Sequence, residues 1–499
     1  MLSSASATTA QVDRAAPAPN LDRSLVRGIA WTGAMRWATQ LVGWASTLIV
    51  ARLLAPTDYG LMGMALVYLG FMQMVNELGL GAAIVQRRDL TEHQIARLGG
   101  LALLAGGAFV GVSALAAIPV AAFFGETAVR WIITVSSLTF LTSALQIVPR
   151  ALLARDLEFR RLAWADGIEA LLMTATTLTL AAIGLRYWAL VLGPLAGRTA
   201  STVAVNAWRP HRIAWPRPLA SIGGAVAFGW QVVVARIAWY FYSNADFTVV
   251  GRVLGKAALG AYTLGWTISS IPVDRVTALV GSVTSAVFSA AQHDRGALQR
   301  YLRNLTEGIA FITFPASVGM ALIADDFILV ALGAQWQPAI LPLRLLALSA
   351  ALRSVSALLP QVAVSTGHAK RNMQLTILAT LILPFLFYVG SRWGTAGVAA
   401  AWVVGHPLFV LPLFLLYALH LTGLSLAAYL RVLWPAAGAT AVMAAAVLTL
   451  RWLTRDAWPV SVRLGSQVLL GAAVYSAVVF TTRRERLRAL WGLFRDLRN

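Results

Sequence analysis

Two arginines separated by 200 residues, Arg36 and Arg236, each lie inside a long apolar segment of the chain. A charge at the middle of a bilayer costs about 2.5–3.5 kcal/mol on insertion scales, so it normally faces a cavity or a partner. The planar guanidinium group binds phosphate through two parallel hydrogen bonds. The pair therefore predicts a cavity for an anionic ligand. The alternative for Arg36 is that its side chain snorkels to the nearby membrane surface.

Two carboxylates inside apolar segments, Glu77 and Asp274, lie within one helical turn of positions related by the same offset. They would neutralise the arginines, or they would bind a coupling cation or proton. The competing interpretations are that Glu77 only marks the cytoplasmic end of its helix and that Asp274 pairs with its neighbour Arg275.

Five other ionisable residues lie within apolar segments: Asp166, Glu169, Arg198, Arg344 and Arg353. Arg344 and Arg353 are nine residues apart, which is about two and a half helical turns, so their side chains point to different sides of one helix. One of them would reach a cavity and the other a helix interface.

An aromatic run over residues 239–242 (Trp-Tyr-Phe-Tyr) stands close to Asn244 and Asp246. Aromatic faces combined with polar groups suit sugar rings. Tyr240 and Tyr242 are therefore candidates for contacts with a glycan. The alternative is that they anchor the helix at the membrane surface, a common role of tryptophan and tyrosine at the ends of spans.

Motifs for covalent chemistry are missing from the sequence. It has no cysteine, and its six histidines do not stand at metal-ligand spacing. HExxH, GxxxxGK[ST] and GxSxG are absent, which argues against zincins, P-loop ATPases and α/β-hydrolases. We therefore expect no metal, no cofactor and no enzymatic activity. His406, which precedes Pro407 in an apolar segment, is interpreted as a packed histidine rather than a proton relay.

Composition places all of these residues in a membrane. Of the 499 residues, 59% are hydrophobic and only 12% are charged, whereas soluble domains carry about 25% charged residues. A spanning helix needs about twenty mostly apolar residues. Fourteen segments fit: 28–50, 61–84, 98–122, 131–149, 163–184, 187–207, 221–243, 260–288, 305–323, 338–364, 374–391, 395–419, 428–450 and 462–482. The predicted fold class is an all-α polytopic membrane protein.

The net charge of +20 is distributed unevenly along the fourteen segments. If both termini are cytoplasmic, 25 of the 40 lysines and arginines lie on the inside, 9 on the outside and 6 within spans. This is the bias of the positive-inside rule, and it predicts cytoplasmic N- and C-termini in a bacterial inner membrane. Anionic lipid headgroups, rather than nucleic acid, are the expected partners of the basic surface.

Residues 49–60 and 249–260 form an internal repeat, in which four positions are identical: Val50/Val250, Arg52/Arg252, Leu54/Leu254 and Gly60/Gly260. The first span thus corresponds to the seventh. This predicts two parallel halves of the protein that are related by a pseudo-two-fold axis. The alternative is that two short loops are similar by chance. The predicted organisation is a disordered cytoplasmic tail (1–25), a six-helix N-lobe (26–210), a six-helix C-lobe (211–420), two further helices (421–482) and a basic cytoplasmic tail (483–499).

Four segments carry a family resemblance: ARLLAPTDYGLMGMA (51–65), FMQMVNELGLGAAIVQRRDLT (71–91), PRALLARDLEFRRLAWAD (149–166) and NADFTVVGRVLGKAALGAYTLGW (244–266). They resemble the Wzx-type polysaccharide flippases of the multidrug/oligosaccharidyl-lipid/polysaccharide (MOP) exporter superfamily, and in particular the branch of colanic-acid and xanthan exporters. The resemblance extends from about residue 25 to 480 and does not identify the sugar.

This resemblance implies a V-shaped, MATE-like transporter of two six-helix lobes. It implies transport of an undecaprenyl-diphosphate-linked oligosaccharide from the cytoplasmic to the periplasmic leaflet by alternating access, for exopolysaccharide biosynthesis. Polymerase and export proteins of the same pathway would be further partners. By position, Arg36 and Arg236, followed by Arg275 and Arg353, are the candidates to hold the pyrophosphate. Since no ATPase motif is present, a membrane potential or an ion gradient would supply the energy.

Three other functions compete with this hypothesis. A multidrug antiporter of the same superfamily would need an acidic cavity for cationic drugs, and the arginines oppose that. A peptidoglycan-precursor flippase would share the helix count and the basic residues. A membrane-embedded ligase or polymerase would usually hold its catalytic groups in a large external loop, and every predicted loop is short.

Overall fold

The computed structural model of the protein describes residues 45–76, 80–86, 89–215, 243–455 and 457–482, together with Gly43 and Tyr240. These residues form helices joined by short turns, and no β-strand occurs among them. The elements, with η for 3-10 and π-helical turns, are α2 (Pro56–Asn76), α3 (Leu80–Gln86), α4 (Glu92–Phe124), α5 (Thr127–Ser136), α6 (Leu138–Arg155), α7 (Phe159–Ala182), α8 (Trp188–Trp208), η2 (Val250–Leu254), α10 (Gly255–Ala290), α11 (Arg295–Phe327), η3 (Ile328–Leu332), η4 (Ala334–Ala339), α12 (Ile340–Ser356), α13 (Leu358–Ser365), α14 (Ala369–Gly390), η5 (Ser391–Trp393), α15 (Gly394–Ala400), η6 (Ala401–Val410), α16 (Leu411–Thr422), α17 (Leu426–Thr454) and α18 (Val460–Thr482). Residues 45–53 and 243–249 are also helical.

Seven stretches of the described helices are long and apolar enough to cross a bilayer: Glu92–Phe124, Thr127–Arg155, Arg295–Leu332, Ala334–Ser365, Ala369–Thr422, Leu426–Thr454 and Val460–Thr482. Apolar spans are helical because a helix satisfies its own backbone hydrogen bonds in lipid. The chain is thus a multi-pass membrane protein. Each predicted segment that the structure describes coincides with one helix or with consecutive helices. Segments 28–50 and 221–243 lie mostly outside the described residues, so the total of fourteen stays a prediction.

Local sequence signals set the ends of several long helices. A capping box begins α4: the Gln94 N–H donates to Thr91 Oγ1 at 3.3 Å, and the Thr91 N–H donates to Gln94 Oε1 at 2.9 Å. Gly125, with φ of +73°, ends α4 in the left-handed conformation that glycine adopts without strain. Asp294 and Ser425 cap α11 and α17 in the same way as Thr91 caps α4, by accepting a backbone N–H three residues later.

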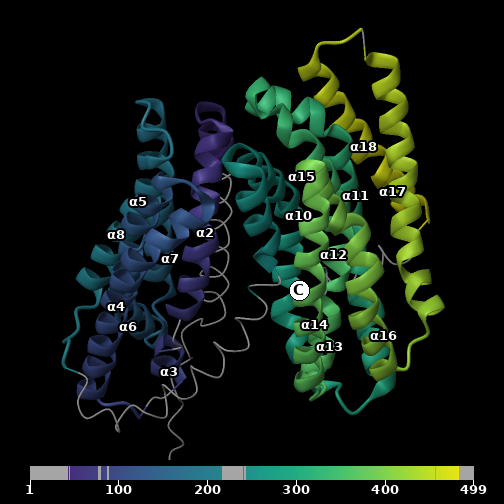
Figure 1. Ribbon diagram of the computed structural model, residues 1–499. Coiled ribbons are helices and arrows are strands. Elements are labelled where there is room, and N and C mark those ends of the chain that lie inside the picture. Colours follow the sequence, from purple (N-terminus) through teal and green to yellow (C-terminus); the bar gives the residue numbers. More distant parts are fainter. Residues whose placement is uncertain are drawn as a thin grey trace, which may run out of the picture.

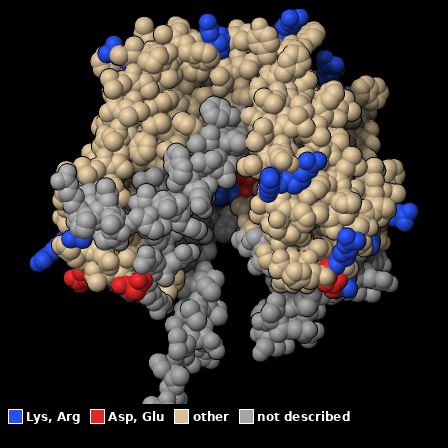
Figure 2. Space-filling view, turned by 60° about the horizontal axis from the view of Figure 1, so that its bottom comes forward, with Lys and Arg blue, Asp and Glu red and all other residues tan. Residues whose placement is uncertain are grey.

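The helices form two groups that lie side by side (Figure 1). Helices α2–α8, coloured purple to teal, make up one group. Helices α10–α16 make up the other, and α17 and α18, in yellow, lie along its outer edge. Figure 2, viewed from the end where α3 and α13 lie, shows that the surface is hollowed between the groups, with basic and acidic side chains in the opening.

The two groups meet where α2 and α10 cross, and the contact there is reciprocal. A Cβ atom on Gly60 would lie only 1.7 Å from the carbonyl oxygen of Lys256, and one on Gly260 would lie 1.7 Å from that of Pro56. Both glycines and both carbonyls are related by the repeat offset of 200 residues. Such an exchange of partners is what a two-fold relation between the repeats requires. Only glycine permits so close a backbone approach.

Other contacts join the groups at the end where α2 and α10 begin. The Trp336 indole N–H donates to the Ala51 carbonyl at 2.7 Å, and the Gln335 amide donates to the Arg52 carbonyl at 3.0 Å. Lys256 forms an ion pair with Glu126 at 2.8 Å. This end, opposite the hollow, is therefore held together by hydrogen bonds, an ion pair and close packing.

Helices α17 and α18 are attached to α11 through two neighbouring carboxylates. Asp326 is buried and accepts two hydrogen bonds from Arg463, at 2.6 and 2.8 Å, and one from Gln467 at 3.1 Å. Asp325 forms ion pairs with Arg344 and Arg451. The predicted intramembrane charge Arg344 thus serves a helix interface.

Candidate functional site

Arg353 of α12 stands at the centre of a cluster of aromatic and acidic side chains from distant parts of the chain. Its guanidinium carbon lies 4.0 Å from the ring centre of Trp266 on α10 and 5.3 Å from that of Trp402 on η6. A cation over the face of an aromatic ring is attracted by the ring quadrupole, and the attraction grows when water is excluded. The two tryptophans therefore fix the position of a charge within the apolar bundle.

Asp246, in the helical residues 243–249, supplies the buried counter-charge. Its carboxylate is fully buried and accepts hydrogen bonds from the Tyr262 hydroxyl at 2.8 Å, the Trp402 indole at 2.9 Å and the Phe247 N–H at 2.9 Å. Arg353 interacts with it electrostatically. A buried charge is tolerated only when it is paired and hydrogen-bonded, and Asp246 meets both conditions.

Arg353 also interacts electrostatically with Asp274 of α10, which in turn interacts with its neighbour Arg275. The interaction with Arg275 is one of the interpretations that the sequence left open for Asp274, whereas Arg353 is a partner that the sequence did not suggest. Asp274 and Arg275 are exposed, Arg353 is partly exposed and Asp246 is buried. Arg353 therefore interacts both with a buried carboxylate, Asp246, and with an exposed one on α10, Asp274.

His406 lies on the inner side of this cluster. It is buried, its ring centre is 5.6 Å from that of Trp402, and its Nδ1 has no hydrogen-bond partner within the described residues. Both residues belong to η6, a π-helical segment that contains Pro407. Because proline lacks the N–H needed for a regular helical bond, a wider turn forms there. The packing of His406 accords with its interpretation as a core histidine.

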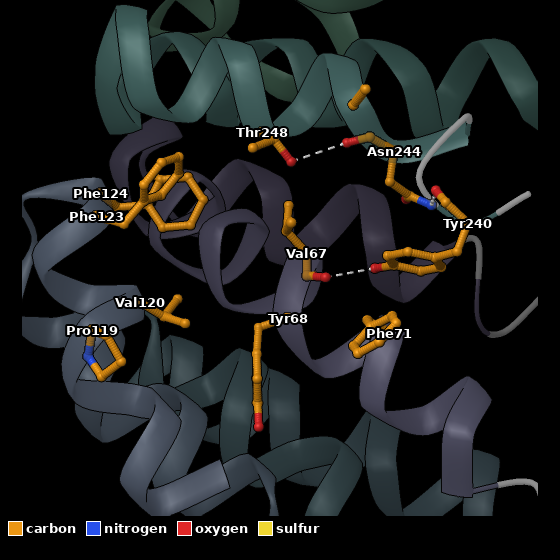
Figure 3. A pocket seen from close by; sticks show the side chains of 11 residues that line it. Val67, Tyr68, Phe71, Pro119, Val120, Phe123, Phe124, Tyr240, Asn244 and Thr248 are labelled. Carbon is orange, nitrogen blue, oxygen red and sulfur yellow. Dashed lines mark hydrogen bonds between the residues drawn. The ribbon is translucent and has the colours of Figure 1, made fainter. Parts of the chain in front are cut away.

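A second feature is a cavity of about 360 Å³ between α2, α4 and residues 240–248 (Figure 3). Its lining residues are Val67, Tyr68, Phe71, Pro119, Val120, Phe123, Phe124, Tyr240, Asn244, Ala245 and Thr248. Tyr240, predicted to contact sugar, lies here, and its hydroxyl donates to the carbonyl of Val67 at 2.7 Å. The structure therefore places Tyr240 in an apolar cavity rather than among the side chains around Arg353.

Four predicted site residues, Arg36, Glu77, Arg236 and Tyr242, lie outside the described residues, so their roles stay predictions. The remaining charges within spans pair internally: Arg198 with Glu169 at 3.3 Å, and Arg150 with Asp166. In the sequence, Asp246 stands out only as a polar neighbour of the aromatic run at residues 239–242, and its role as a buried counter-charge is not predicted. Its occurrence in an otherwise apolar segment was the signal that could have marked it as a buried counter-charge.

No three histidine or acidic side chains of the described residues are placed to hold a metal ion. The cluster around Arg353 instead offers a guanidinium to an anion. The partly exposed ring of Trp266 also offers an apolar surface to a ring-shaped group, whereas Trp402 is buried.

The family model for polysaccharide biosynthesis proteins matches residues 49–341. The chain is 21% identical over 431 residues to the lipopolysaccharide biosynthesis protein WzxC of Escherichia coli (strain K12), a match that covers 83% of this chain and 85% of WzxC. It is 26% identical over 335 residues to the succinoglycan biosynthesis transport protein ExoT of Rhizobium meliloti (strain 1021), which covers 66% of each chain.

Among solved structures, the fold is similar to that of the lipid II flippase MurJ in an inward closed conformation. The TM-score is 0.73 at 13% identity, and the match covers 92% of this chain and 100% of the other. At this identity the likeness concerns the fold alone.

Proposed function

Because the chain belongs to the polysaccharide biosynthesis protein family, we propose that it is a flippase that carries a lipid-linked oligosaccharide across the membrane for polysaccharide biosynthesis. The family match and the similarity to WzxC confirm the resemblance to Wzx-type flippases seen in the sequence. The name of ExoT as a transport protein and the fold shared with the flippase MurJ support transport rather than covalent chemistry.

The proposed cargo is an undecaprenyl-diphosphate-linked repeat unit, and Arg353 is the observation that carries this choice. Arg353 is a partly exposed residue, its guanidinium lies over two tryptophans, and Asp274 interacts both with it and with Arg275. Guanidinium groups in this arrangement suit a diphosphate. Asp246 and Asp274 keep the Arg353 guanidinium in place and lower the electrostatic cost of holding it in a membrane. The partly exposed Trp266 would lie against the first sugar.

We further propose that transport proceeds by alternating access between two six-helix lobes, 26–210 and 211–420, with helices of 421–482 as an addition. The hollow in Figure 2 is the substrate entrance, and the end closed by the Gly60 and Gly260 contacts opens later in the cycle. With both termini in the cytoplasm of a bacterial cell, the hollow faces the cytoplasm. A membrane potential or an ion gradient drives the cycle, and Asp274 and Glu77 remain candidates for coupling.

The rival functions fit less well. A multidrug antiporter would present acidic rather than basic groups to its cargo. A peptidoglycan-precursor flippase would share the MurJ-like fold, but the family match and the names of WzxC and ExoT favour polysaccharide intermediates. A ligase or polymerase would need external catalytic loops, and the described loops are short.

Transport assays with charge variants test this proposal. In a strain that lacks the chain, complementation with Arg353→Gln should lower polymer export and delivery of the lipid-linked repeat unit to the outer leaflet at least about tenfold, because a charge-assisted contact to the diphosphate is lost. Arg353→Lys should be intermediate, since lysine keeps the charge without the planar fork. Digestion by an impermeant glycosidase measures the delivered repeat unit.

Arg130→Gln is the matched control, since Arg130 also stacks on a tryptophan, Trp131 at 5.4 Å, but is exposed and distant in sequence from the cluster. The double variant Arg36→Ala, Arg236→Ala should abolish export without loss of membrane insertion. Normal export by Arg353→Gln, at wild-type protein level, would contradict an anion site at Arg353. Normal export by the double variant would contradict an anion site at Arg36 and Arg236. Unchanged delivery in the deletion strain contradicts the flippase function itself.

A further inference from the structure

The cavity in Figure 3 is built by both groups of helices. The first group contributes residues of α2 and α4, such as Phe71, Val120 and Phe123. Tyr240, Asn244 and Thr248 complete the wall, and the helical residues 243–249 are tied to the second group by the hydrogen bonds of Asp246 with α10 and η6. The shape of the cavity must therefore change whenever the two groups move relative to each other. A cavity on the outer surface of one group would not have this property.

The polar side chains of the cavity are already used within the protein. The Tyr240 hydroxyl donates to the Val67 carbonyl at 2.7 Å, the Asn244 amide donates to the Tyr240 carbonyl at 3.0 Å, and the Thr248 hydroxyl donates to the Asn244 carbonyl at 3.3 Å. The Tyr68 hydroxyl donates to Ser113 at 3.2 Å. A water molecule needs two to four polar partners, whereas this cavity offers mainly aromatic and aliphatic surface. Its chemistry selects an apolar occupant.

A cation stands beside one end of the cavity. The guanidinium carbon of Arg252 lies 5.6 Å from the ring centre of Phe123, a lining residue. Arg252 is exposed, and no carboxylate of the described residues forms an ion pair with it, whereas the nearby Lys256 is paired with Glu126. An apolar cavity with a cation at its rim suits an amphiphile that has an apolar chain and an anionic headgroup.

We propose that this cavity holds the first isoprene units of the polyprenyl chain of the transported lipid, with the diphosphate at Arg252. This inference rests on the proposed function. The volume of about 360 Å³ lies at the lower end of the range for small-ligand pockets, so the cavity suits a short piece of the polyprenyl chain rather than its whole length. Arg252 lies at the end opposite the hollow, so the site would hold the lipid after its headgroup has crossed.

Photo-crosslinking of the full chain in nanodiscs tests this site, with a farnesyl diphosphate analogue that carries a diazirine on its chain as the probe. Labelling should map to residues 119–124, to Tyr240 and to residues 244–248. Val120→Trp, which fills the cavity, and Arg252→Gln, which removes the cation beside Phe123, should each reduce labelling about tenfold. Unlabelled farnesyl diphosphate should compete, and phosphatidylglycerol should not.

Two variants serve as matched controls and should label normally. Val112→Trp adds the same bulk to an exposed position of α4, and Arg130→Gln removes a cation from the ring of Trp131, which does not line this cavity. Full labelling of both Val120→Trp and Arg252→Gln overturns the proposal, and so does equal competition by phosphatidylglycerol, which would make the occupant a bulk lipid. Because export in the deletion strain is measured separately, the flippase function can stand when this site fails.

Discussion

At the scale of single residues, Arg353 is kept in an apolar bundle by aromatic rings and nearby carboxylates. Trp266 and Trp402 provide ring faces, and Asp246 and Asp274 interact with its charge electrostatically. The burial of these two carboxylates differs, and so does the expected effect of replacing them.

Asp246→Ala should destabilise the folded protein by about 3–5 kcal/mol, because it leaves the charge of Arg353 without its buried partner and removes an acceptor for Tyr262 and Trp402. Asp274→Ala should cost about 1 kcal/mol or less, since Asp274 is exposed. Thermal unfolding in detergent measures both variants. Equal losses of stability would show that Asp246 is not the main counter-charge.

At the scale of elements, α2 and α10 form the junction of the two halves through residues that the repeat relates. Gly60 and Gly260 each contact the backbone of the opposite helix, and the side chain that a non-glycine residue would add has no space. The junction therefore requires glycine at both positions, and because each glycine lies four residues after the carbonyl that meets the other, the two contacts have the same geometry.

Gly60→Ala should force α2 and α10 apart and open the end of the molecule opposite the hollow. The cost of such overpacking is typically about 1–3 kcal/mol. Because the chain has no cysteine of its own, a single Ala51→Cys reporter at a fully buried position can detect the opening. Its labelling by an impermeant maleimide should rise several-fold in the Gly60→Ala background.

Gly107→Ala is the control for this experiment, because nothing lies within 4 Å of the added methyl group. It should leave the labelling of the Ala51→Cys reporter unchanged. If labelling of the Ala51→Cys reporter does not rise in the Gly60→Ala variant, the backbone contact does not hold the two helices together.

At the scale of the whole molecule, the two groups are joined at one end and separated by a hollow at the other (Figures 1 and 2). The joined end combines polar contacts, notably Lys256 with Glu126 and Trp336 with the Ala51 carbonyl, with apolar packing of α2 against α10, where Met64 and Leu259 belong to one hydrophobic cluster. The polar contacts at this end can break and re-form when the groups move. This arrangement is compatible with a relative motion of the two groups.

A reducible cross-link between Glu126→Cys and Lys256→Cys should block transport in proteoliposomes, because it ties the first group to the second where opening is required. Reduction should restore transport of the lipid-linked repeat unit. The control pair, Arg150→Cys with Asp166→Cys, replaces an ion pair within the first group and should not affect transport when cross-linked. Undiminished transport by the Glu126–Lys256 cross-linked protein would exclude opening at this end.

The sequence by itself determined the helical membrane architecture and the family. Both follow from local properties. Apolar segments of sufficient length must be helical in lipid, and family motifs such as residues 51–65 and 244–266 are continuous stretches that can be recognised in the sequence alone. The repeat offset also pointed to Gly60 and Gly260, whose reciprocal contact the structure then displays.

Only the tertiary structure decided which polar residues meet. Arg344 and Arg353 lie on one helix, yet one serves an interface with α17 through Asp325 and the other serves the central cluster. Asp246, Trp266 and Trp402 come together from segments separated by up to 156 residues, and the cavity at Tyr240 needs walls from both groups. The reason is physical: helical periodicity fixes the direction of a side chain relative to its own helix, whereas the neighbours it meets depend on how the helices pack against one another.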